Sequence, residues 1–382
     1  MLPSRPWGLS KQHGAKLVSH KETISQIKTI AFYLPQYHPI PENDEWWGPG
    51  FTEWTNVTAA RPLFRRHKQP HLPSELGFYD LRVPEVREQQ ARLAQEYGIS
   101  AFCYWHYWFA GKKLLERPLE EVVASGYPDF PFCIAWANQT WTGVWHGAPD
   151  KILIEQTYPG PDDDRAHFEA LLPMLTDRRY FKLDGRPLIY IFRPEQLPDP
   201  AEFLHRWRQL AKAHGIDGLY LVAEVSDLLG KGPIYTQYRE HGFDAGVYIR
   251  IPARLNTTDL LRMRIRRKLF GGPEVYPHSK DWPTPPPNLP PPLHPCVYPN
   301  WDNTARSGRN GLVLVGSNPS IFSRHVAQAL EWMQRSRSSQ QLLFIKSWNE
   351  WAEGNYLEPD REYGRGYLEA LRAATASPPP VS

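Results

Sequence analysis

Short apolar runs recur along the chain and alternate with longer stretches of helical periodicity. The runs are rich in β-branched and aromatic residues, which is typical of strands that are buried on both faces. They lie at residues 29–34, 99–105, 130–136, 187–192, 218–223, 243–249, 296–298 and 342–347. About eight buried strands separated by helices are what a (β/α)₈ barrel requires.

Helical segments occupy the stretches between these runs. Residues 84–97 begin with Pro84, which is favoured in a first turn, and are followed by the stop signal Gly98. Residues 201–214 and 320–334 have the periodicity of further amphipathic helices. Strands that alternate with helices predict a parallel sheet covered by helices, with an active site at the carboxyl ends of the strands.

The length of 382 residues allows one barrel-sized domain or two ordinary ones. The alternation favours one α/β domain, a single (β/α)₈ TIM barrel at residues 27–372 with long loops at the carboxyl ends of its strands. Residues 1–26 are interpreted as an N-terminal extension and residues 373–382 as a disordered tail. Residues 1–28 hold no apolar stretch of signal-peptide length, and no segment approaches about 18 continuous apolar residues. We therefore expect a soluble, cytoplasmic protein.

Composition points to sugars rather than to nucleic acid. The formal net charge of +3 is small for this length, so no nucleic-acid partner is expected. The chain has 15 Trp and 19 Tyr, and several lie in loop-like stretches where flat rings with polar edges suit the faces of sugars. The three Cys are widely spaced without a Cys-x-x-Cys pair, which makes a disulfide framework or zinc site unexpected.

Aromatic and hydrogen-bonding residues are mixed in the stretches that follow four of the runs. Long loops on a barrel also need packing, but four such stretches at predicted strand ends favour a carbohydrate cleft. With the flanks of the last run added, the candidate substrate-binding residues are Tyr37, His38, Trp46, Trp47, Glu53, Trp54, Trp105, His106, Trp136, Asn138, Trp141, Trp301, Asp302, Trp348, Asn349 and Trp351.

The stretch SWNEWAEGNYLEP follows the last run and contains the candidate catalytic pair, Glu350 and Glu353. Residues three apart share one face only on a helical turn, so the two glutamates converge only if the chain turns helically after Ser347. Their short separation would suit a retaining glycosidase better than an inverting one. Partial desolvation by Trp348 and Trp351 would raise the pKa of one carboxyl and leave the other ionised. The alternative is a charged helix N-terminus, which the Trp flanks and the strand-end position make less favourable.

Other polar residues near these motifs have simpler interpretations. Glu358 precedes Pro359 in a turn and is predicted to be structural. His38, His106 and His146 either bind sugar hydroxyls or satisfy loop backbones. Without carboxylates at ligand spacing they do not indicate a metal site, and no cofactor is expected.

Several motifs together resemble the WbsX-like family, often described as glycosyltransferases of lipopolysaccharide or O-antigen synthesis. They are YHPIPENDEWWGPGFTEWTNV, YWHYWF, IAWANQTWT, YPNWDNTAR and SWNEWAEGNYLEPD, and the resemblance runs from about Ile30 to Leu371. That family is similar to glycoside hydrolase family 99, the retaining endo-α-1,2-mannosidases and mannanases, which are (β/α)₈ barrels.

The resemblance to family 99 implies a role for each glutamate. Glu350 would deprotonate the sugar's own 2-hydroxyl, which attacks the anomeric carbon to give a 1,2-anhydro intermediate. Glu353 would protonate the departing oxygen and then activate water. The expected function is retaining cleavage of a polysaccharide or lipid-linked glycan, α-mannoside-like in the first instance. The alternatives are a glycosyltransferase in lipopolysaccharide or O-antigen biosynthesis and a glycan-binding barrel without turnover.

The transferase alternative has one candidate motif. Asp162, Asp163 and Asp164 could belong to an Asp-x-Asp metal and diphosphate site, but they precede an apolar periodic segment and read as the start of a helix. No Gly-rich phosphate loop follows a predicted strand. The motif search therefore favours the hydrolase, although a retaining barrel that excludes water from its acceptor site could also transfer.

One insertion, at about residues 252–295, differs from the rest of the chain. It holds a short basic amphipathic helix candidate at residues 257–272, followed by a polyproline connector at residues 282–295. An ornamental loop between the sixth and seventh strands is the simpler interpretation. The alternative is docking onto an anionic membrane surface, a lipid-linked glycan or an acidic partner.

Overall fold

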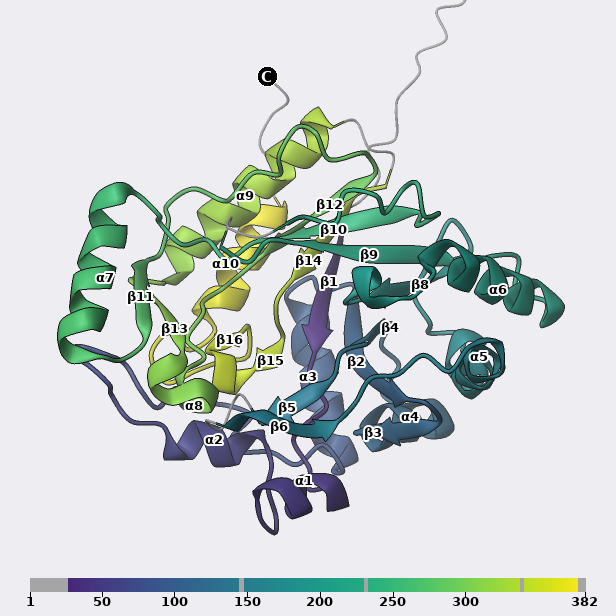
Figure 1. Ribbon diagram of the computed structural model, residues 1–382, viewed down its shortest axis with the longest axis horizontal. Coiled ribbons are helices and arrows are strands. Elements are labelled where there is room, and N and C mark those ends of the chain that lie inside the picture. Colours follow the sequence, from purple (N-terminus) through teal and green to yellow (C-terminus); the bar gives the residue numbers. More distant parts are fainter. Residues whose placement is uncertain (1–26, 144–147, 230–232, 337–339, 377–382) are drawn as a thin grey trace, which may run out of the picture.

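A computed structural model describes residues 27–143, 148–229, 233–336 and 340–376. Eight parallel strands close into a barrel, and its first strand, β1, is the purple arrow near the middle of Figure 1. They are β1 (Lys28–Tyr33), β2 (Ala101–Phe109), β4 (Phe132–Trp136), β8 (Arg186–Ile191), β9 (Tyr220–Ser226), β10 (Ala245–Ile249), β12 (Leu293–Val297) and β14 (Leu342–Ile345). Neighbours follow chain order, and β1 closes the barrel by pairing with both β2 and β14. The predicted α/β barrel is confirmed, although several strands begin or end a few residues from their predicted limits.

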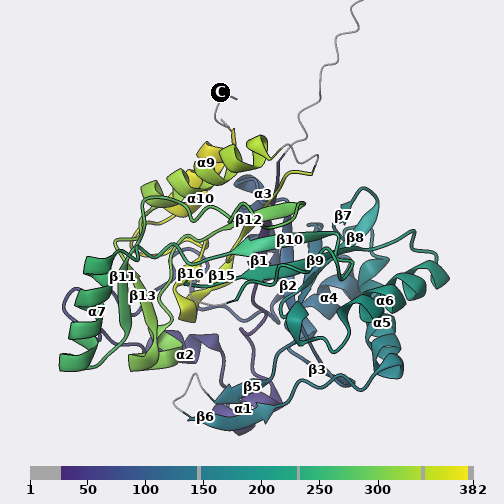
Figure 2. The ribbon, with the colours of Figure 1, turned by 45° about the horizontal axis from the view of Figure 1, so that its top comes forward.

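Short additional strands extend the barrel, and most of them follow its strands at their carboxyl ends. β5 (Trp141–Gly143) pairs with β6 (Ala148–Ile154), and Figures 1 and 2 show this ribbon beside α1. The remaining ones are β3 (Lys112–Leu114), β7 (Lys182–Leu183), β11 (Glu274–Pro277), β13 (Leu312–Val315), β15 (Asn349–Glu350) and β16 (Asn355–Tyr356). β11 pairs with β13, and β15 with β16.

Helices surround the barrel and decorate its loops (Figure 1). They are α1 (Pro41–Trp47), α2 (Glu53–Ala59), α3 (Pro84–Glu96), α4 (Arg117–Ser125), α5 (Pro161–Leu175), α6 (Pro200–Ala213), α7 (Thr257–Phe270), α8 (Thr304–Ser307), α9 (Pro319–Arg335) and α10 (Gly366–Ala376). Local signals start several of them. In α6 the Asp199 side chain accepts a hydrogen bond from the Glu202 N–H at 2.9 Å, and in α9 Asn318 caps Ile321 at 3.1 Å. The predicted helices at 84–97, 201–214 and 320–334 are confirmed as α3, α6 and α9.

Aromatic rings from several strands fill the barrel interior. Phe32 of β1 stacks on Trp105 of β2, with ring centroids 5.0 Å apart, and meets Tyr190 of β8 edge-on at 4.9 Å. Phe344 of β14 lies 5.8 Å from Phe32, so four strands share this layer. Large rings in contact bury much apolar area without voids. The layer forms a solid base beneath the carboxyl ends of the strands.

The predicted domain limits, residues 27 and 372, can be compared with the described residues at each end of the chain. The predicted extension, residues 1–26, lies outside the described residues, as do residues 377–382. Helix α10 continues to Ala376 and so covers the first residues of the predicted tail, because Ala374 packs into the core. Within the described part of the chain, no helix has the length and apolar character that crossing a membrane requires.

Gly246 of β10 provides a test of barrel packing. A Cβ at this position would come within 2.7 Å of Val225 Cγ2 and 2.9 Å of Leu293 Cδ1. We expect Gly246→Ala to lower the free energy of unfolding by about 1–3 kcal/mol, because a filled core must shift to accept the methyl group. Denaturant unfolding measures this change. Adding Val225→Ala should make the double variant less destabilised than the sum of the two single changes; strict additivity would contradict the contact.

Candidate active site

The chain that leaves β14 is tied to the first strand before it reaches the two glutamates. The Trp348 N–H donates to the Phe32 carbonyl at 2.7 Å. The Asn349 side chain accepts a hydrogen bond from the Leu34 N–H at 2.7 Å and donates to the Leu34 carbonyl at 3.0 Å. These buried bonds satisfy polar groups at the barrel rim and fix the start of the loop.

A single 3₁₀ turn, Trp351–Glu353, joins β15 to β16 and brings Glu350 and Glu353 to one side. The helical turn that the spacing requires is therefore present, but it begins at Trp351 and follows a short strand rather than Ser347. Gly354 ends the turn with φ of 57°, and a Cβ there would lie 2.9 Å from the backbone nitrogen of Asp302. The Asp302 N–H donates to the Glu353 carbonyl at 2.7 Å, which requires this close approach.

Each carboxylate of the pair has its own partner. Glu350 Oε1 accepts a hydrogen bond from Trp105 Nε1 at 2.8 Å. Glu353 Oε1 accepts one from Arg306 Nη1 at 2.7 Å, and the Nε of the same guanidinium donates to Glu53 at 3.0 Å. All three glutamates are buried. Arg306 therefore connects the turn after β14 to helix α2.

The surroundings push the pKa values of the two glutamates apart. Burial and then the charge of Glu350 raise the pKa of Glu353 well above its usual range, although Arg306 opposes them. Burial also acts to raise the pKa of Glu350, but the hydrogen bond with Glu353 and the charges of Lys346 and Arg306 outweigh it and lower that pKa. The surroundings therefore favour the ionised form of Glu350 and the protonated form of the neighbouring Glu353.

Lys346 supplies a second cation, and this one is buried. Its Nζ lies over the rings of Trp105 and Phe192, 5.3 and 5.5 Å from their centroids. Burial lowers its pKa, but Glu224 and then Glu350 outweigh that effect, so the pKa of Lys346 is raised. The ammonium group remains charged and stabilises the ionised form of Glu350.

A cavity of about 470 Å³ opens onto both glutamates. Its size is that of a small-molecule or oligosaccharide pocket. Seven of the sequence-predicted residues line it: Trp47, Glu53, Trp105, Trp141, Trp301, Glu350 and Glu353. The cavity thus combines indole faces with carboxylates at the carboxyl ends of the strands.

A second group of predicted residues lies behind the cavity wall and holds the lining in place. Tyr37 donates to the Asn349 carbonyl, and Trp54 Nε1 donates to the Tyr79 carbonyl at 2.8 Å. Asp302 accepts a hydrogen bond from His67 at 2.8 Å, and its bonds to His67 and His71 outweigh burial and lower its pKa. The other members are Trp46, Asn138, Trp348, Asn349 and Trp351.

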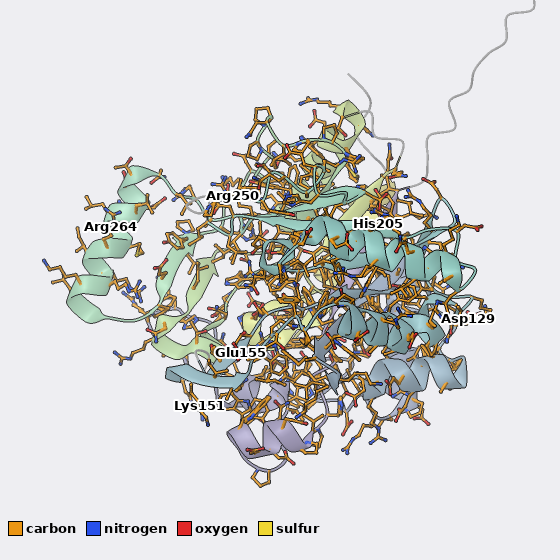
Figure 3. The ribbon with its side chains drawn as sticks, turned by 45° about the vertical axis from the view of Figure 1, so that its right-hand side comes forward. Asp129, Lys151, Glu155, His205, Arg250 and Arg264 are labelled. Carbon is orange, nitrogen blue, oxygen red and sulfur yellow. The ribbon has the colours of Figure 1, made fainter. Side chains whose placement is uncertain are left out.

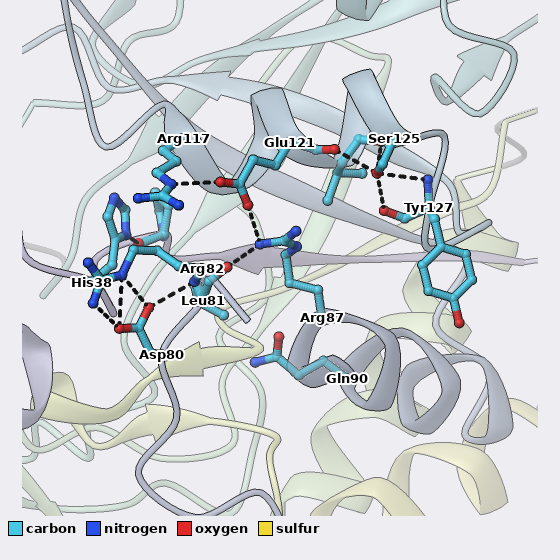
Figure 4. Close-up of polar contacts among 12 residues, drawn as sticks. His38, Asp80, Leu81, Arg82, Arg87, Gln90, Arg117, Glu121, Ser125 and Tyr127 are labelled. Atoms are coloured by element: carbon cyan, nitrogen blue, oxygen red, sulfur yellow. Dashed lines mark hydrogen bonds and ion pairs between the residues drawn. The ribbon is translucent and has the colours of Figure 1, made fainter. Parts of the chain in front are cut away.

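Three predicted residues point away from the cavity. Figure 4 shows His38 beside Asp80 and Arg82, and its Nδ1 lies 3.1 Å from the Pro35 carbonyl. His106 meets His167 at 2.9 Å in the helix layer, and Trp136 stacks on Trp207 there. Strand alternation explains this, since Trp105 faces inward and its neighbour His106 faces outward. His146 lies outside the described residues.

Sequence reasoning missed four charged residues of the cavity lining: Arg193, Glu224, Arg306 and Lys346. Glu224 lines the cavity directly after the predicted run 218–223, a position that should have been considered with the other strand ends. Lys346 interrupts an otherwise apolar run, which is itself a signal of a buried charge. Arg306 ends the YPNWDNTAR motif, but no local pattern indicates that it reaches Glu53 and Glu353.

Comparison with known families gives this site a context. The family model described as "Glycosyltransferase WbsX" matches residues 29–371. The chain belongs to the WbsX family. Its relatives include the uncharacterized protein WxcX of Xanthomonas campestris pv. campestris, in strains B100 and ATCC 33913, each 39% identical over 367 residues and 92% of this chain. The chain spans about half the length of these curated relatives, since the match covers 50% of each.

Solved structures share the WbsX chain's fold at low sequence identity. A glycoside hydrolase-like protein aligns with a TM-score of 0.58, covering 92% of this chain and 95% of the other at 14% identity. The GH99 endo-alpha-mannosidase of Bacteroides thetaiotaomicron aligns with a TM-score of 0.52, covering 91% and 98%, also at 14% identity. At this identity the likeness establishes the barrel fold.

Glu358 is buried behind the 3₁₀ turn and supports it. It accepts hydrogen bonds from Trp351 Nε1 at 2.6 Å, Gln90 Nε2 at 2.7 Å and the Tyr79 hydroxyl at 2.8 Å. Burial nevertheless raises its pKa to about 7. A carboxyl whose pKa is raised by folding stabilises the folded state at low pH and loses that contribution as the pH rises through the folded value.

The Glu358→Gln variant should change how stability depends on pH. The wild type must ionise a buried carboxyl between pH 5.5 and 8.5, and the variant need not, so the variant should gain about 2 kcal/mol relative to wild type over this range. Urea unfolding at both pH values measures the difference, with Glu169→Gln on an exposed part of α5 as the control. A difference between wild type and Glu358→Gln that stays constant with pH would contradict the raised pKa.

Proposed function

We propose that the protein cleaves a glycosidic bond in a polysaccharide with retention of configuration, through Glu350 and Glu353. The observation that carries the proposal is that the pKa values of two carboxyls on one turn are shifted in opposite directions beneath an indole-lined cavity. General acid–base catalysis needs one group that accepts a proton and one that donates it at the same pH. The two carboxyls lie on one short turn and each shifts the pKa of the other, which suits the close spacing of retaining enzymes better than the roughly 6.5–9.5 Å typical of inverting ones.

The resemblance to family 99 implies that Glu350 is the base and Glu353 the acid. The lowered pKa of Glu350 and the raised pKa of Glu353 fit these roles. Ionised Glu350 takes the proton of the sugar 2-hydroxyl, and that oxygen bonds to the anomeric carbon as the bond to the leaving oxygen breaks. Protonated Glu353 gives its proton to the leaving oxygen. Glu353 then takes a proton from water, whose oxygen bonds to the anomeric carbon as the bond from that carbon to the 2-oxygen breaks, and Glu350 returns its proton to the 2-oxygen.

The lining of the cavity favours a neutral glycan over a nucleotide sugar. Its charged residues among those described are four carboxylates and three cations: Glu53, Glu224, Glu350, Glu353, Arg193, Arg306 and Lys346. Arg306 already bonds two carboxylates, so little positive charge is left for a diphosphate. The named endo-alpha-mannosidases share the fold, which makes α-mannans early substrates to test.

Transfer of a sugar during lipopolysaccharide or O-antigen assembly is the second candidate, and the family description favours it. In that reaction an acceptor hydroxyl would replace water at the anomeric carbon and give its proton to Glu353. Asp163 and Asp164, the acids of the Asp-x-Asp-like run, are bound to Trp108 at 3.1 Å and Arg206 at 2.9 Å at the start of α5. A transferase of this chain would therefore use the glutamate pair.

Substitution of each glutamate tests the proposal. Wild-type protein and Glu350→Gln, Glu353→Gln and exposed Glu369→Gln variants are incubated with α-mannan and bacterial polysaccharides, without nucleotide sugar, and new reducing ends are measured. We expect wild type and Glu369→Gln to cleave and the other two to lose about 10²–10⁴-fold in rate. An aryl glycoside of the same sugar, whose leaving group needs no proton, should restore release of the aryl group by Glu353→Gln but not by Glu350→Gln.

Other outcomes would redirect the assignment. Cleavage that survives in both variants would remove the glutamates from catalysis. Glycan binding without cleavage by wild type would indicate a binding barrel, and product formation only with a nucleotide sugar and an acceptor would establish the transferase.

The pH profile provides a second test, through Lys346. Activity should need ionised Glu350 and protonated Glu353, so kcat/KM should fall at both low and high pH. Lys346→Met keeps the bulk of the side chain but removes a charge that lowers the pKa of both glutamates. We expect both limbs of the profile to move to higher pH by about one unit, whereas exposed Lys182→Met should leave them in place. Unmoved limbs in Lys346→Met would contradict the electrostatic role.

A further inference from the structure

Helix α7 carries a row of apolar side chains on its exposed surface. Leu261, Ile265 and Leu269 are 57%, 49% and 67% exposed. Because they are spaced four residues apart, they lie in one row along the helix. A helix that only covers a core has the opposite arrangement, with its apolar row turned inward. On α7 the inward positions hold partly buried Leu260 and Met263 together with buried Asp259, so the exposed row is a second apolar face that does not cover the core.

Cations border the apolar row on both sides. At 3.6 residues per turn, Arg264 and Lys268 lie along one edge of the row and Arg262 along the other. All three are exposed, and Arg262 approaches Asp259 only to 3.9 Å. Figure 3 shows Arg264 on the outer side of α7, at the edge of the molecule.

Other contacts hold α7 in a defined position, so the row is presented by a fixed helix. The Asn256 side chain caps the helix by accepting from the Asp259 N–H at 2.8 Å. Arg266 lies over the Phe64 ring at 4.4 Å, and Arg267 forms an ion pair with Glu274 of β11 at 2.7 Å. Figures 1 and 2 both show α7 beside β11 with its far side turned away from the barrel.

We propose that α7 docks the protein onto an anionic phospholipid bilayer. Leu261, Ile265 and Leu269 enter the boundary between headgroups and acyl chains, while Arg262, Arg264 and Lys268 contact the lipid phosphates. The apolar row complements the acyl chains of this surface, and the cations beside it complement the anionic phosphates. Helices that lie in a membrane interface have this arrangement. The proposal rests on α7 alone and not on the proposed chemistry.

Helix α7 begins near the cavity, so docking through α7 would bring the cavity close to the membrane. Ile251 lines the cavity at the end of β10, and α7 begins shortly afterwards at Thr257. The docking helix therefore belongs to the same end of the barrel as the cavity. A glycan held at a membrane surface would approach the protein from this side.

Vesicle flotation tests the docking. The full chain is mixed with phosphatidylcholine vesicles that contain or lack phosphatidylglycerol, and the bound fraction is measured at low and high salt. We expect wild type to float only with the anionic vesicles and to dissociate at high salt. The Arg264→Glu/Lys268→Glu variant should bind at least about thirtyfold more weakly, since each cation near such a surface contributes roughly fivefold. The Leu261→Ser/Ile265→Ser/Leu269→Ser variant should also lose binding, because the inserted side chains are replaced by polar ones.

Matched controls separate docking from general charge and folding effects. Lys182→Glu/Lys212→Glu reverses two exposed cations elsewhere, and Tyr127→Ser removes another exposed apolar side chain; both should float like wild type. Thermal unfolding checks that the α7 variants remain folded. Wild type that does not float, equal binding to neutral vesicles, or α7 variants that float like wild type would overturn the proposal. Concentration-dependent dimerisation lost in the triple Ser variant would assign the row to a second copy of the chain and overturn it as well.

Discussion

Charges buried at the carboxyl end of the barrel must be paired there, and this requirement determines how the site is built. The groups concerned are four buried carboxylates, buried Lys346 and half-buried Arg306; the carboxylates are Glu53, Glu224, Glu350 and Glu353. Each cation faces more than one carboxylate, since Arg306 bonds Glu53 and Glu353, and Glu224 and Glu350 both favour the charged form of Lys346. Burial raises the pKa of both Glu53 and Glu353, and the charge of Glu350 adds to this effect, so that the pKa of Glu353 is raised well above its usual range. The raised pKa of Glu353 is thus a product of its charged neighbours as well as of burial.

The same requirement explains why loops far apart in sequence are joined at the rim. Arg306 lies on α8 and reaches back to Glu53 on α2 and across to Glu353. Gly354 lets the Asp302 backbone approach the turn. The hydrogen bond from the Asp302 N–H to the Glu353 carbonyl then holds the segment before α8 against the 3₁₀ turn through the backbone alone. A change in the length of one loop would therefore move a charge out of reach of its partners. The packing of these loops therefore determines which charges are paired at the site.

Local pattern was sufficient for the barrel and for part of the site. Continuous apolar runs mark strands buried on both faces, and the Glu-x-x-Glu spacing implies a turn that brings Glu350 and Glu353 together. The direction of a side chain at a strand end is harder to predict, because Trp105 and His106 are neighbours with similar surroundings in sequence yet face opposite sides of the barrel wall. Arg306 could not be predicted at all, since its partners lie 253 and 47 residues away and are chosen by tertiary structure. Motif composition therefore identifies the rim, and only the fold selects which residues face the cavity.

Helix α7 breaks the pattern that governs the rest of the chain. The large apolar side chains exposed elsewhere are scattered, whereas α7 presents Leu261, Ile265 and Leu269 outward in one row while Asp259 is buried beneath it. Exposed apolar rows are costly in a protein that remains in water, because they favour association. The insertion is nonetheless secured by a cap, an ion pair and a cation–ring contact. A helix that is held in place with its apolar row outward is suited to binding a surface outside the barrel. Because α7 starts a few residues after Ile251, that surface would lie at the end of the barrel where the cavity opens.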